Sequence, residues 1–542
     1  PLANNVDRAN HLSDPLISLS GFVRVRVHNI ALTMGCCSNW SPTSKRLCAL
    51  GSTTGLCVFA LVLGLVWPAL IWEIAKQEFV LEPGTEVYEN WIDPPIDTYL
   101  EIFLWNWTNA AEYRTEKPHL EELGPYTFVE RHERVNLVWN DNDTLTFQQR
   151  RIWHYLPERS VGNYETDRVI TINPVLLTVG YALRNEPEFL FYVDGIITGN
   201  NLATTPFYDV LVREMIFEGY DDLVLTSLLA LLELIPEESR PPIDLPPYDR
   251  FGWFFGRNGS ESYDGTFTIG TGKDNVHNTG LMRLWNGANA TDYYRGACGQ
   301  IRGTTGEVWP PWGRTLSGTP PNVSVFAPDV CSSVTLQYAE EMERYGIDGL
   351  RWIGNDRVFD NGVHYEESRC QCTAEDETTC PVLDNGSMDV SRCKFGAPAT
   401  VSFPHFYLAN ESYLAGVSGM KPNEKEHRFE MELEPYTGVP LGVKAQLQVN
   451  LNVRQYGMSL LKDIPEVMLP MLWFRQTATL TDELADDIKL ILILPDIGVY
   501  VAYALGAIGI VGLVLAVYFS VTRWKLQSTA APSTAEAKQA LD

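Results

Sequence analysis

The sequence has 542 residues and is strongly acidic, with 68 Asp and Glu against 41 Lys and Arg and a formal net charge of −27. Because nucleic-acid binding needs a basic surface for the phosphates, this balance argues against a nucleic-acid partner. Hydrophobic residues make up 45% of the chain and charged residues 20%, which is ample material for a packed core.

The N-terminal region divides at the first methionine, because the sequence opens on proline and Met34 is its first methionine. We interpret residues 1–33 as translated upstream sequence that is not part of the native protein, and 34–47 as a cytoplasmic tail. Cysteines beside a membrane helix on its reducing side are candidates for S-palmitoylation, with unmodified thiols as the alternative. These candidates are Cys36, Cys37 and Cys48.

Two long apolar segments, 48–72 and 497–521, flank the rest of the chain. Each has about 25 residues without Asp, Glu, Lys or Arg, enough for a helix to cross a ~30 Å hydrocarbon layer. Lys and Arg precede the first segment and follow the second, so both termini are predicted to be cytoplasmic. A cleaved signal peptide is the alternative for the first segment, disfavoured by its length and by the lack of a small-residue cleavage pattern. Small residues spaced by four in both segments predict that these helices pack together or self-associate.

Much of the region between the membrane segments is predicted to be β structure. In 443–454, six apolar residues alternate with polar ones, which is typical of a half-buried antiparallel strand. The segments 134–139 and 144–153 are joined by Asn-Asp-Asn-Asp, which predicts a hairpin. Further strands are expected at 126–130 and 265–270.

The pattern becomes helical from about 174 to 235. A helix is predicted to begin at Pro174, because proline is favoured at the first helical position. Apolar residues at spacings of three, four and eight predict a second helix, with one face formed by Phe207, Val210, Leu211 and Met215. The apolar segment 223–235 is too short to span a bilayer and is either a buried core helix or an apolar rim at a binding surface.

The segment 73–496 is predicted to be one external region in an oxidising compartment, followed after the second apolar segment by a cytoplasmic tail, 522–542. An even number of clustered cysteines predicts three disulfides, and a zinc site in the last four is the disfavoured alternative. These cysteines are Cys298, Cys331, Cys370, Cys372, Cys380 and Cys393. Sequons predict N-glycosylation at Asn106, Asn142, Asn258, Asn289, Asn322, Asn385 and Asn410.

Motifs for catalysis do not stand out. The sequence contains no His-Glu-x-x-His, no phosphate-binding Walker loop and no complete dinucleotide or nucleophile-elbow motif. We therefore expect a protein that is not an enzyme and that needs neither a metal ion nor a cofactor.

Several motifs together resemble one family. They are Gly-Pro-Tyr-Thr-Phe at 124–128, Phe-Gly-Trp at 251–253 before Asp264-Gly265, Trp-Asn-Gly at 285–287, Cys298-Gly299 leading to Pro310-Pro311, Phe-Pro-His-Phe-Tyr at 403–407, Val-Ser-Gly-Met-Lys-Pro at 417–422 and Glu-Pro-Tyr-Thr-Gly-Val-Pro at 434–440. With two terminal apolar segments, they make the chain similar to the class B scavenger receptors, the family of fatty acid translocase, lysosomal integral membrane protein two and the insect sensory neuron membrane proteins. The resemblance covers nearly all of the chain from Met34 to Lys525. Within the family, it is strongest to insect phagocytic receptors for apoptotic cells.

The resemblance implies an α+β external region, in which a large twisted antiparallel β-barrel carries a membrane-distal helical bundle at about 170–240 and encloses a hydrophobic tunnel. It also implies the disulfides Cys298–Cys370, Cys331–Cys393 and Cys372–Cys380. In the bundle, apolar residues are expected to contact the ligand, namely Leu176, Leu177, Tyr181, Phe189, Phe191 and Tyr192.

One departure from the family concerns charge. Relatives that bind anionic ligands rely on lysines in the bundle, whereas this chain has no lysine between Lys117 and Lys273. From 170 to 240 it has three arginines against eleven Asp and Glu. Binding of an anionic lipid therefore requires another patch or an apolar contact.

The function implied by the resemblance is a receptor that binds lipids, lipid-bearing particles or apoptotic cells and delivers lipid to the membrane. The expected partners are fatty acids, sterols, phospholipids or lipoprotein particles, apoptotic-cell or pathogen surfaces, the membrane itself and a second copy of the chain. The alternatives are a phagocytic or adhesion receptor without lipid transport, and a chemosensory co-receptor for lipids. The tails lack an acidic dileucine signal, which favours the plasma membrane over endosomes or lysosomes.

Overall fold

The structure is a computed structural model and describes residues 41–529, apart from 237, 239, 241–247, 314–317 and 375–376. The predicted upstream segment 1–33, the cysteines Cys36 and Cys37, and residues 530–542 of the C-terminal tail lie outside the described residues. The chain forms two compact units. Leu70–Leu494 makes up one, and the chain before Leu70 and after Leu494 makes up the other.

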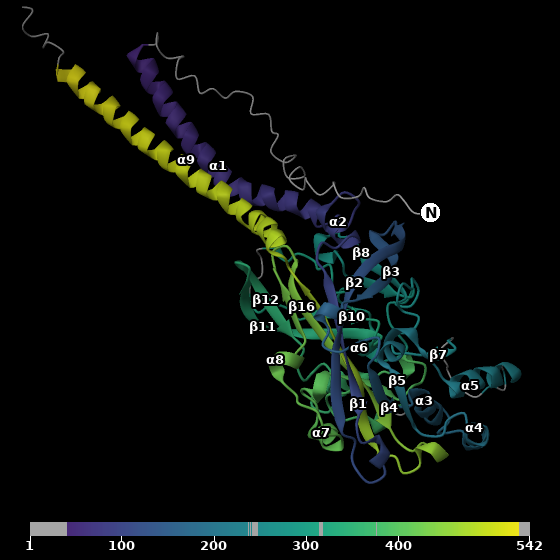
Figure 1. Ribbon diagram of the computed structural model, residues 1–542. Coiled ribbons are helices and arrows are strands. Elements are labelled where there is room, and N and C mark those ends of the chain that lie inside the picture. Colours follow the sequence, from purple (N-terminus) through teal and green to yellow (C-terminus); the bar gives the residue numbers. More distant parts are fainter. Residues whose placement is uncertain are drawn as a thin grey trace, which may run out of the picture. The chain divides into compact units, whose positions relative to one another are not determined.

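The smaller unit contains the apolar parts of helices α1 (Pro42–Glu78) and α9 (Asp482–Thr529), which lie side by side (Figure 1). Both are long and apolar enough to cross a membrane, over Thr43–Glu78 and Asp482–Thr522. Small residues form their contact: Ala60 is 4% exposed, and a Cβ on Gly506 would lie 3.7 Å from the Cβ of Ala60. The prediction that the two helices pack through small residues is confirmed.

The larger unit is built on one large antiparallel sheet, with the strand order β10-β11-β12-β15-β16-β17-β1-β2-β3-β8-β9. Two further strands, β13 (Met388–Asp389) and β14 (Ala399–Ser402), extend it beside β16. The bounds in sheet order are β10 (Val323–Ala327), β11 (Ser332–Arg344), β12 (Ile347–Ile353), β15 (Glu430–Leu433), β16 (Pro440–Val453), β17 (Val467–Thr479), β1 (Thr98–Trp107), β2 (Leu120–Asn140), β3 (Thr144–Tyr155), β8 (Thr266–Gly270) and β9 (Met282–Trp285).

The two ends of this sheet order are connected through residues 303 and 304. Met282 of β9 donates its backbone N–H to the carbonyl of Gly303 at 2.8 Å, and Phe326 of β10 donates to the carbonyl of Thr304 at 2.8 Å. Gly303 has φ +80°, and a Cβ there would lie 1.8 Å from the carbonyl oxygen of Ser324, so only glycine permits this approach. The sheet is thus nearly closed, and the predicted antiparallel barrel architecture is confirmed.

Each strand predicted from the sequence lies in this sheet. The hairpin predicted at 134–153 is formed by β2 and β3, with the turn between Asn140 and Thr144. The strand predicted at 126–130 is part of β2, the one at 265–270 corresponds to β8, and the one at 443–454 corresponds to β16.

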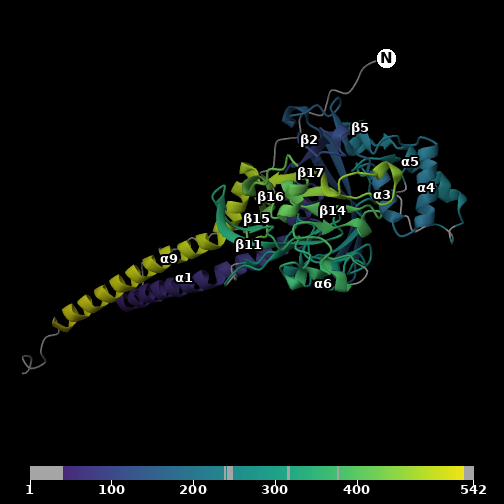
Figure 2. The same cartoon turned by 90° about the horizontal axis from the view of Figure 1, so that it is seen from below.

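Three helices of the region 174–235 gather on one side of the larger unit (Figure 2) and are called the helical bundle below. They are α3 (Pro174–Ala182), α4 (Pro187–Gly199) and α5 (Leu223–Leu234). Pro174 is the first residue of α3, as predicted, and the side chain of Asn173 caps the helix by accepting from the N–H groups of Val175 and Leu176. Helix α5 buries Val224, Leu225 and Leu228 but exposes Leu223 and Leu234, so it is part core and part surface.

The prediction of a helix with Phe207, Val210, Leu211 and Met215 on one face is wrong. Phe207–Leu211 is strand β5, which pairs with β4 (Arg168–Ile172), and Met215 lies in a short π-helix, η5 (Glu214–Glu218). A periodicity over so few residues does not distinguish the two structures. Here residues 207–211 form a strand because their backbone pairs with β4.

The six cysteines of the larger unit form three disulfides, Cys298–Cys370, Cys331–Cys393 and Cys372–Cys380. These are the pairs that the resemblance implies. Because all four cysteines of the zinc alternative are used in these bonds, that alternative is wrong.

Candidate functional site

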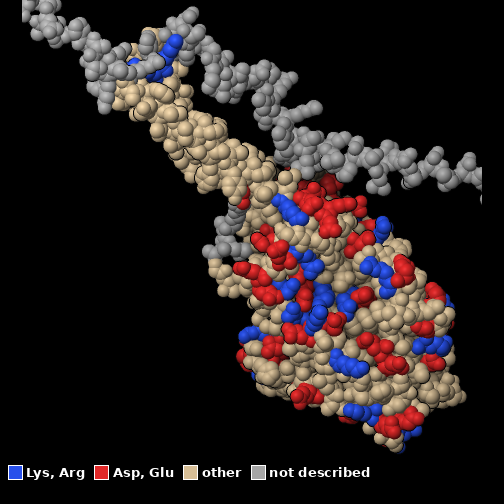
Figure 3. Space-filling view, turned by 60° about the vertical axis from the view of Figure 1, so that its left-hand side comes forward, with Lys and Arg blue, Asp and Glu red and all other residues tan. Residues whose placement is uncertain are grey.

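The two faces of the large sheet differ in chemistry. On one face, called the apolar face below, Leu447 of β16 lies opposite Phe474 of β17, which lies opposite Ile102 of β1, which lies opposite Tyr126 of β2. The other face carries ion pairs, such as Arg344 with Glu432 at 2.7 Å and Arg475 with Glu101 at 3.2 Å. Figure 3 shows basic and acidic side chains interspersed over one side of the molecule. The ion-paired face is therefore suited to water, and the apolar face to the interior.

Some residues of the apolar face are not fully buried. Val443 and Ala445 of β16, Val449 of the same strand and Phe474 of β17 are each partly exposed. Their alternation along β16 agrees with the sequence pattern, in which these residues point the same way. The tunnel implied by the resemblance stays a prediction.

The polar side of β16 corrects the expectation of a half-buried strand. Gln446, Gln448 and Asn450 have no exposed surface. Gln448 donates to the side-chain oxygen of Asn450 at 2.8 Å, and Asn450 donates to the hydroxyl of Ser402 on β14 at 3.1 Å. Gln446 donates to the backbone carbonyls of Glu426 and Arg428. These hydrogen bonds offset the burial of the three amides.

A cluster of largely buried charged side chains interrupts the apolar face. Glu130, His132 and Arg151 project from β2 and β3 on the same face as Phe128 and Trp153. Arg257 pairs with Asp264 at 2.9 Å and with Asp329 at 2.7 Å. We call this cluster the charged belt, and it comprises Glu130, His132, Arg134, Arg151, Arg257, Asp264, Glu307 and Asp329.

In the charged belt, ion pairing has a larger effect than burial on the pKa values of Glu130, Asp329 and His132. Burial opposes the charged form of Glu130, but Arg151 and His132 outweigh it and lower the pKa of this carboxyl. Burial likewise opposes ionisation of Asp329, and Arg257 outweighs it, so that the pKa of Asp329 falls to about 2. His132 hydrogen-bonds to both Glu130 and Glu307, and these carboxylates raise its pKa against the effect of burial. In these three groups, neighbouring charges of opposite sign thus outweigh the effect of burial.

The residues predicted to contact ligand in the helical bundle separate into two groups. Leu176 and Leu177 have no exposed surface and belong to the core, and Phe189 is partly buried against it. Phe191 and Tyr192 are 77% and 67% exposed, with ring centroids 6.0 Å apart. Tyr181 is half-buried and packs edge-on against Tyr456 at 5.4 Å. The structure thus leaves Phe191, Tyr192 and Tyr181 accessible and places the two leucines out of reach of a ligand.

The predicted modification sites are exposed enough to be modified. Each of the seven sequon asparagines is at least partly exposed, as attachment of a glycan requires. Cys48 lies in α1 and is partly exposed. Glycosylation and acylation stay predictions. Among the described residues, no three His, Cys, Asp or Glu side chains are grouped to hold a metal ion.

A polar cluster that the sequence did not indicate joins β2, β17 and the loops after β14. Glu122 accepts hydrogen bonds from the indole of Trp473 and from His405, both at 2.8 Å. Burial opposes ionisation of Glu122, but these two hydrogen bonds outweigh it and lower the pKa. His405 lies in the Phe-Pro-His-Phe-Tyr motif at 403–407, which contributed to the family resemblance. The motif alone does not indicate that His405 contacts Glu122.

Comparisons with known proteins agree with this architecture. The model of the CD36 family matches residues 51–520. Protein peste of Drosophila melanogaster is 31% identical over 450 residues, covering 82% of this chain and 77% of that protein. Scavenger receptor class B member 1 of Mus musculus is 31% identical over 84% of this chain and 85% of its own length. Lysosome membrane protein 2 of Rattus norvegicus is 28% identical over 88% and 93%. The chain belongs to the CD36 family.

Proposed function

We propose that this protein is a class B scavenger receptor, which binds lipids or lipid-bearing particles outside the cell and delivers lipid to the membrane along the apolar face of its sheet. The family and the name of the scavenger receptor relatives support the receptor role. The partly exposed residues Val443, Ala445 and Phe474 on the apolar face support contact with an alkyl chain.

Delivery along a covered path has a clear physical benefit. Each methylene exposed to water costs about 0.8 kcal/mol, so a 16-carbon chain crossing water costs roughly 12 kcal/mol. An apolar path lowers this barrier without an energy source. The receptor would act as a passive conduit with no catalytic step.

The test blocks the apolar face with a bulky side chain. Ala445→Trp adds an indole to this face, whereas Thr477→Trp adds one on the opposite face of the neighbouring strand β17. We expect Ala445→Trp to reduce cellular uptake of a fluorescent fatty acid at least fivefold while particle binding persists. Thr477→Trp should leave both unchanged. Uptake that is unaffected by Ala445→Trp would refute delivery along this face.

A receptor for apoptotic cells or pathogens without lipid transport is the second candidate, and the charged belt favours it. The belt places ionised groups on the same face as the apolar residues, where an alkyl chain finds no favourable contact. Under this alternative, fatty-acid uptake is the same in cells with the wild-type protein, in cells with Ala445→Trp and in cells without the receptor.

The proposed location is the plasma membrane, with both termini in the cytoplasm and 73–496 outside. The two apolar helices fit a membrane protein, and one relative is named for the lysosome membrane. Surface biotinylation of intact cells tests the assignment, because a lysosomal protein is labelled only after permeabilisation.

A further inference from the structure

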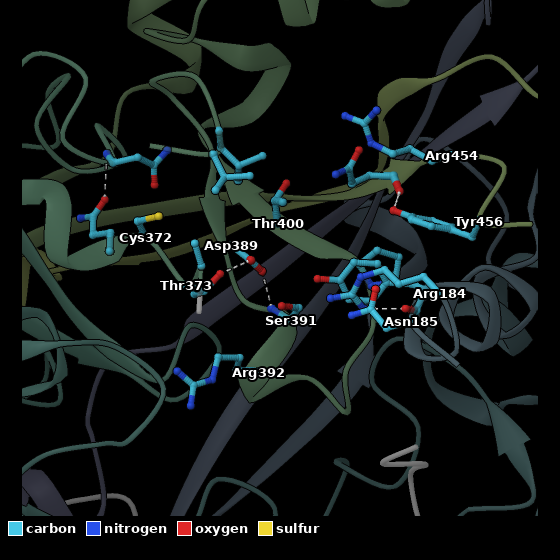
Figure 4. A pocket seen from close by; sticks show the side chains of 18 of the residues that line it. Arg184, Asn185, Cys372, Thr373, Asp389, Ser391, Arg392, Thr400, Arg454 and Tyr456 are labelled. Carbon is cyan, nitrogen blue, oxygen red and sulfur yellow. Dashed lines mark hydrogen bonds between the residues drawn. The ribbon is translucent and has the colours of Figure 1, made fainter. Parts of the chain in front are cut away.

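A pocket of about 890 Å³ lies beside the helical bundle, where the end of α3 meets the disulfide-linked part of the chain (Figure 4). Most of its lining residues come from 181–185, 371–374, 382–392 and 452–456, and Arg295, Asn361, Pro398 and Thr400 complete the walls. Figure 4 shows Arg184, Asn185 and Tyr456 on one side of this pocket and Thr373 and Arg392 on the other, with Asp389 and Ser391 between them.

The charge of this pocket is opposite to that of the chain. Among the described residues, four arginines line it, against one carboxylate, that of Asp389, whereas the chain as a whole carries a net charge of −27. Asp389 is also engaged, since it accepts from the N–H of Ser391 at 2.8 Å and from the hydroxyl of Thr373. A concave site with excess positive charge attracts anions. The lining arginines are Arg184, Arg295, Arg392 and Arg454.

Two of these arginines have structural partners. Arg295 donates to the carbonyl of Cys372 at 3.2 Å and to that of Ala374, and so holds the segment after Cys370. Arg454 pairs with Glu466 at 2.9 Å.

Arg184 and Arg392 differ from these two arginines in their contacts. Both are exposed, and their described hydrogen bonds go to single backbone carbonyls, those of Tyr181 at 2.5 Å and Tyr293 at 3.5 Å. Among the described residues, no carboxylate lies within ion-pairing distance of either guanidinium. Each guanidinium has five N–H donors in a planar fork that matches a phosphate. Within the described part of the chain, each uses only one of its nitrogens in a hydrogen bond.

The pocket also has an apolar side. The rings of Tyr181 and Tyr456 meet edge-on at 5.4 Å, and Arg184 packs over the ring of Tyr181 at 3.8 Å. Val382, which is 65% exposed, and Leu383 add aliphatic surface. An inorganic ion fills only a small part of about 890 Å³, so the dimensions favour an anion that carries an apolar group.

We propose that this pocket binds the phosphate group of an amphipathic lipid, with Arg184 and Arg392 as the anion ligands and the tyrosines beside the glycerol and acyl part. The choice of a lipid over free phosphate rests on the proposed function, which it deepens by naming the lipid class. The site also supplies the positive patch that the lysine-free helical bundle lacks.

The test uses the purified full chain in an uncharged maltoside detergent and titration calorimetry with three probes. These are dihexanoyl phosphatidic acid, inorganic phosphate and uncharged dihexanoylglycerol. We expect phosphatidic acid to bind most tightly, phosphate more weakly and dihexanoylglycerol not measurably. The double variant Arg184→Gln/Arg392→Gln should weaken binding of phosphatidic acid at least about tenfold, because each lost hydrogen bond involves two charged groups.

Arg131→Gln is the matched control, since Arg131 is an exposed arginine on β2 that does not line this pocket. It should bind phosphatidic acid like the wild-type protein. If the double variant does not fold, the single variant Arg392→Gln is used instead, and a smaller loss of affinity for phosphatidic acid is expected. Unchanged affinity in the pocket variants would overturn the proposal, and phosphate binding as tight as that of phosphatidic acid would overturn its lipid part. Because fatty-acid uptake in Ala445→Trp is measured separately, failure of lipid delivery and failure of this site are distinguishable.

Discussion

His405 and His427 lie with their rings stacked, with centroids 4.2 Å apart and planes 11° from parallel. Both are almost fully buried, at 6% and 5% exposed. Burial, and then the neighbouring His405, lower the pKa of His427 to about 4, against the opposing effect of Glu122. Arg475 and Lys444 also face this histidine and act in the same direction as His405. His427 is therefore neutral in the folded protein throughout the range from pH 7 to 5.

This stack predicts a loss of stability in mild acid. Unfolded histidine takes up a proton near pH 6.5 and folded His427 only near pH 4, so the unfolded state binds more protons between these values. The free energy of unfolding should fall as pH drops from 7 to 5, and His427→Gln should reduce that fall by on the order of 1–2 kcal/mol. Urea titrations of the full chain in detergent at pH 7 and pH 5 measure this difference in the free energy of unfolding. His364→Gln, at an exposed histidine, should keep the wild-type difference, and an equal fall in His427→Gln would contradict the prediction.

Removal of one cation from the charged belt should be strongly destabilising. Arg257→Met leaves the buried Asp264 and the partly exposed Asp329 without their main counter-charge, which costs about 3–5 kcal/mol of unfolding free energy. Arg168→Met removes an arginine whose pair with Asp209 is about half exposed, and should cost less than about 1 kcal/mol. Urea titration at pH 7 compares the two variants. Equal, small effects would show that the belt does not depend on its ion pairs.

Closure of the sheet should depend on Gly303. Gly287 has nearly the same backbone conformation, φ +81° against +80°, but a Cβ on Gly287 would meet no atom within 4 Å. Gly287→Ala should therefore cost only about 1–2 kcal/mol for its conformation. Gly303→Ala adds the overlap with the carbonyl of Ser324 and should cost at least about 2 kcal/mol more. Thermal unfolding of the two variants measures the difference, and similar melting temperatures would mean that β10 moves without cost.

The contact between α1 and α9 predicts a specific disulfide. Cysteines at Ala60 and Gly506 would have Cβ atoms about 3.7 Å apart, close to the usual separation in a disulfide. The variants are made in a background with Cys36, Cys37, Cys48 and Cys57 changed to serine. After mild oxidation and cleavage at a protease site inserted in the external region, Ala60→Cys/Gly506→Cys should keep the two fragments joined on a non-reducing gel. Val58→Cys/Val511→Cys, at residues that are 54% and 58% exposed, should not, and a joined control pair would speak against a defined helix contact.

Local patterns in the sequence predicted several elements of this fold. An apolar segment of about 25 residues predicts a spanning helix wherever it occurs, because the requirement comes from the thickness of the bilayer. The alternation at 443–454 predicted which residues of β16 share a face, because side chains on a strand point alternately to its two sides. The same reasoning failed at 207–215, where a few apolar residues fit both periodicities and only pairing with β4 distinguishes them.

The functional features depend on contacts between residues far apart in the chain, and no local pattern encodes these. Glu122 meets His405, and Arg184 shares a pocket with Arg392, only because the folded chain brings those distant segments together. The same holds for burial of Gln446 and Gln448, whose polar character predicted exposure: Gln446 donates to the backbone carbonyls of Glu426 and Arg428, and Gln448 donates to the hydroxyl of Ser402 on β14. The sequence alone thus determined the two long apolar helices and strands such as β16, through the length and period of their apolar residues. Which charges are buried together and where an anion can bind were decided only by tertiary structure, since electrostatic interactions depend on distance in space.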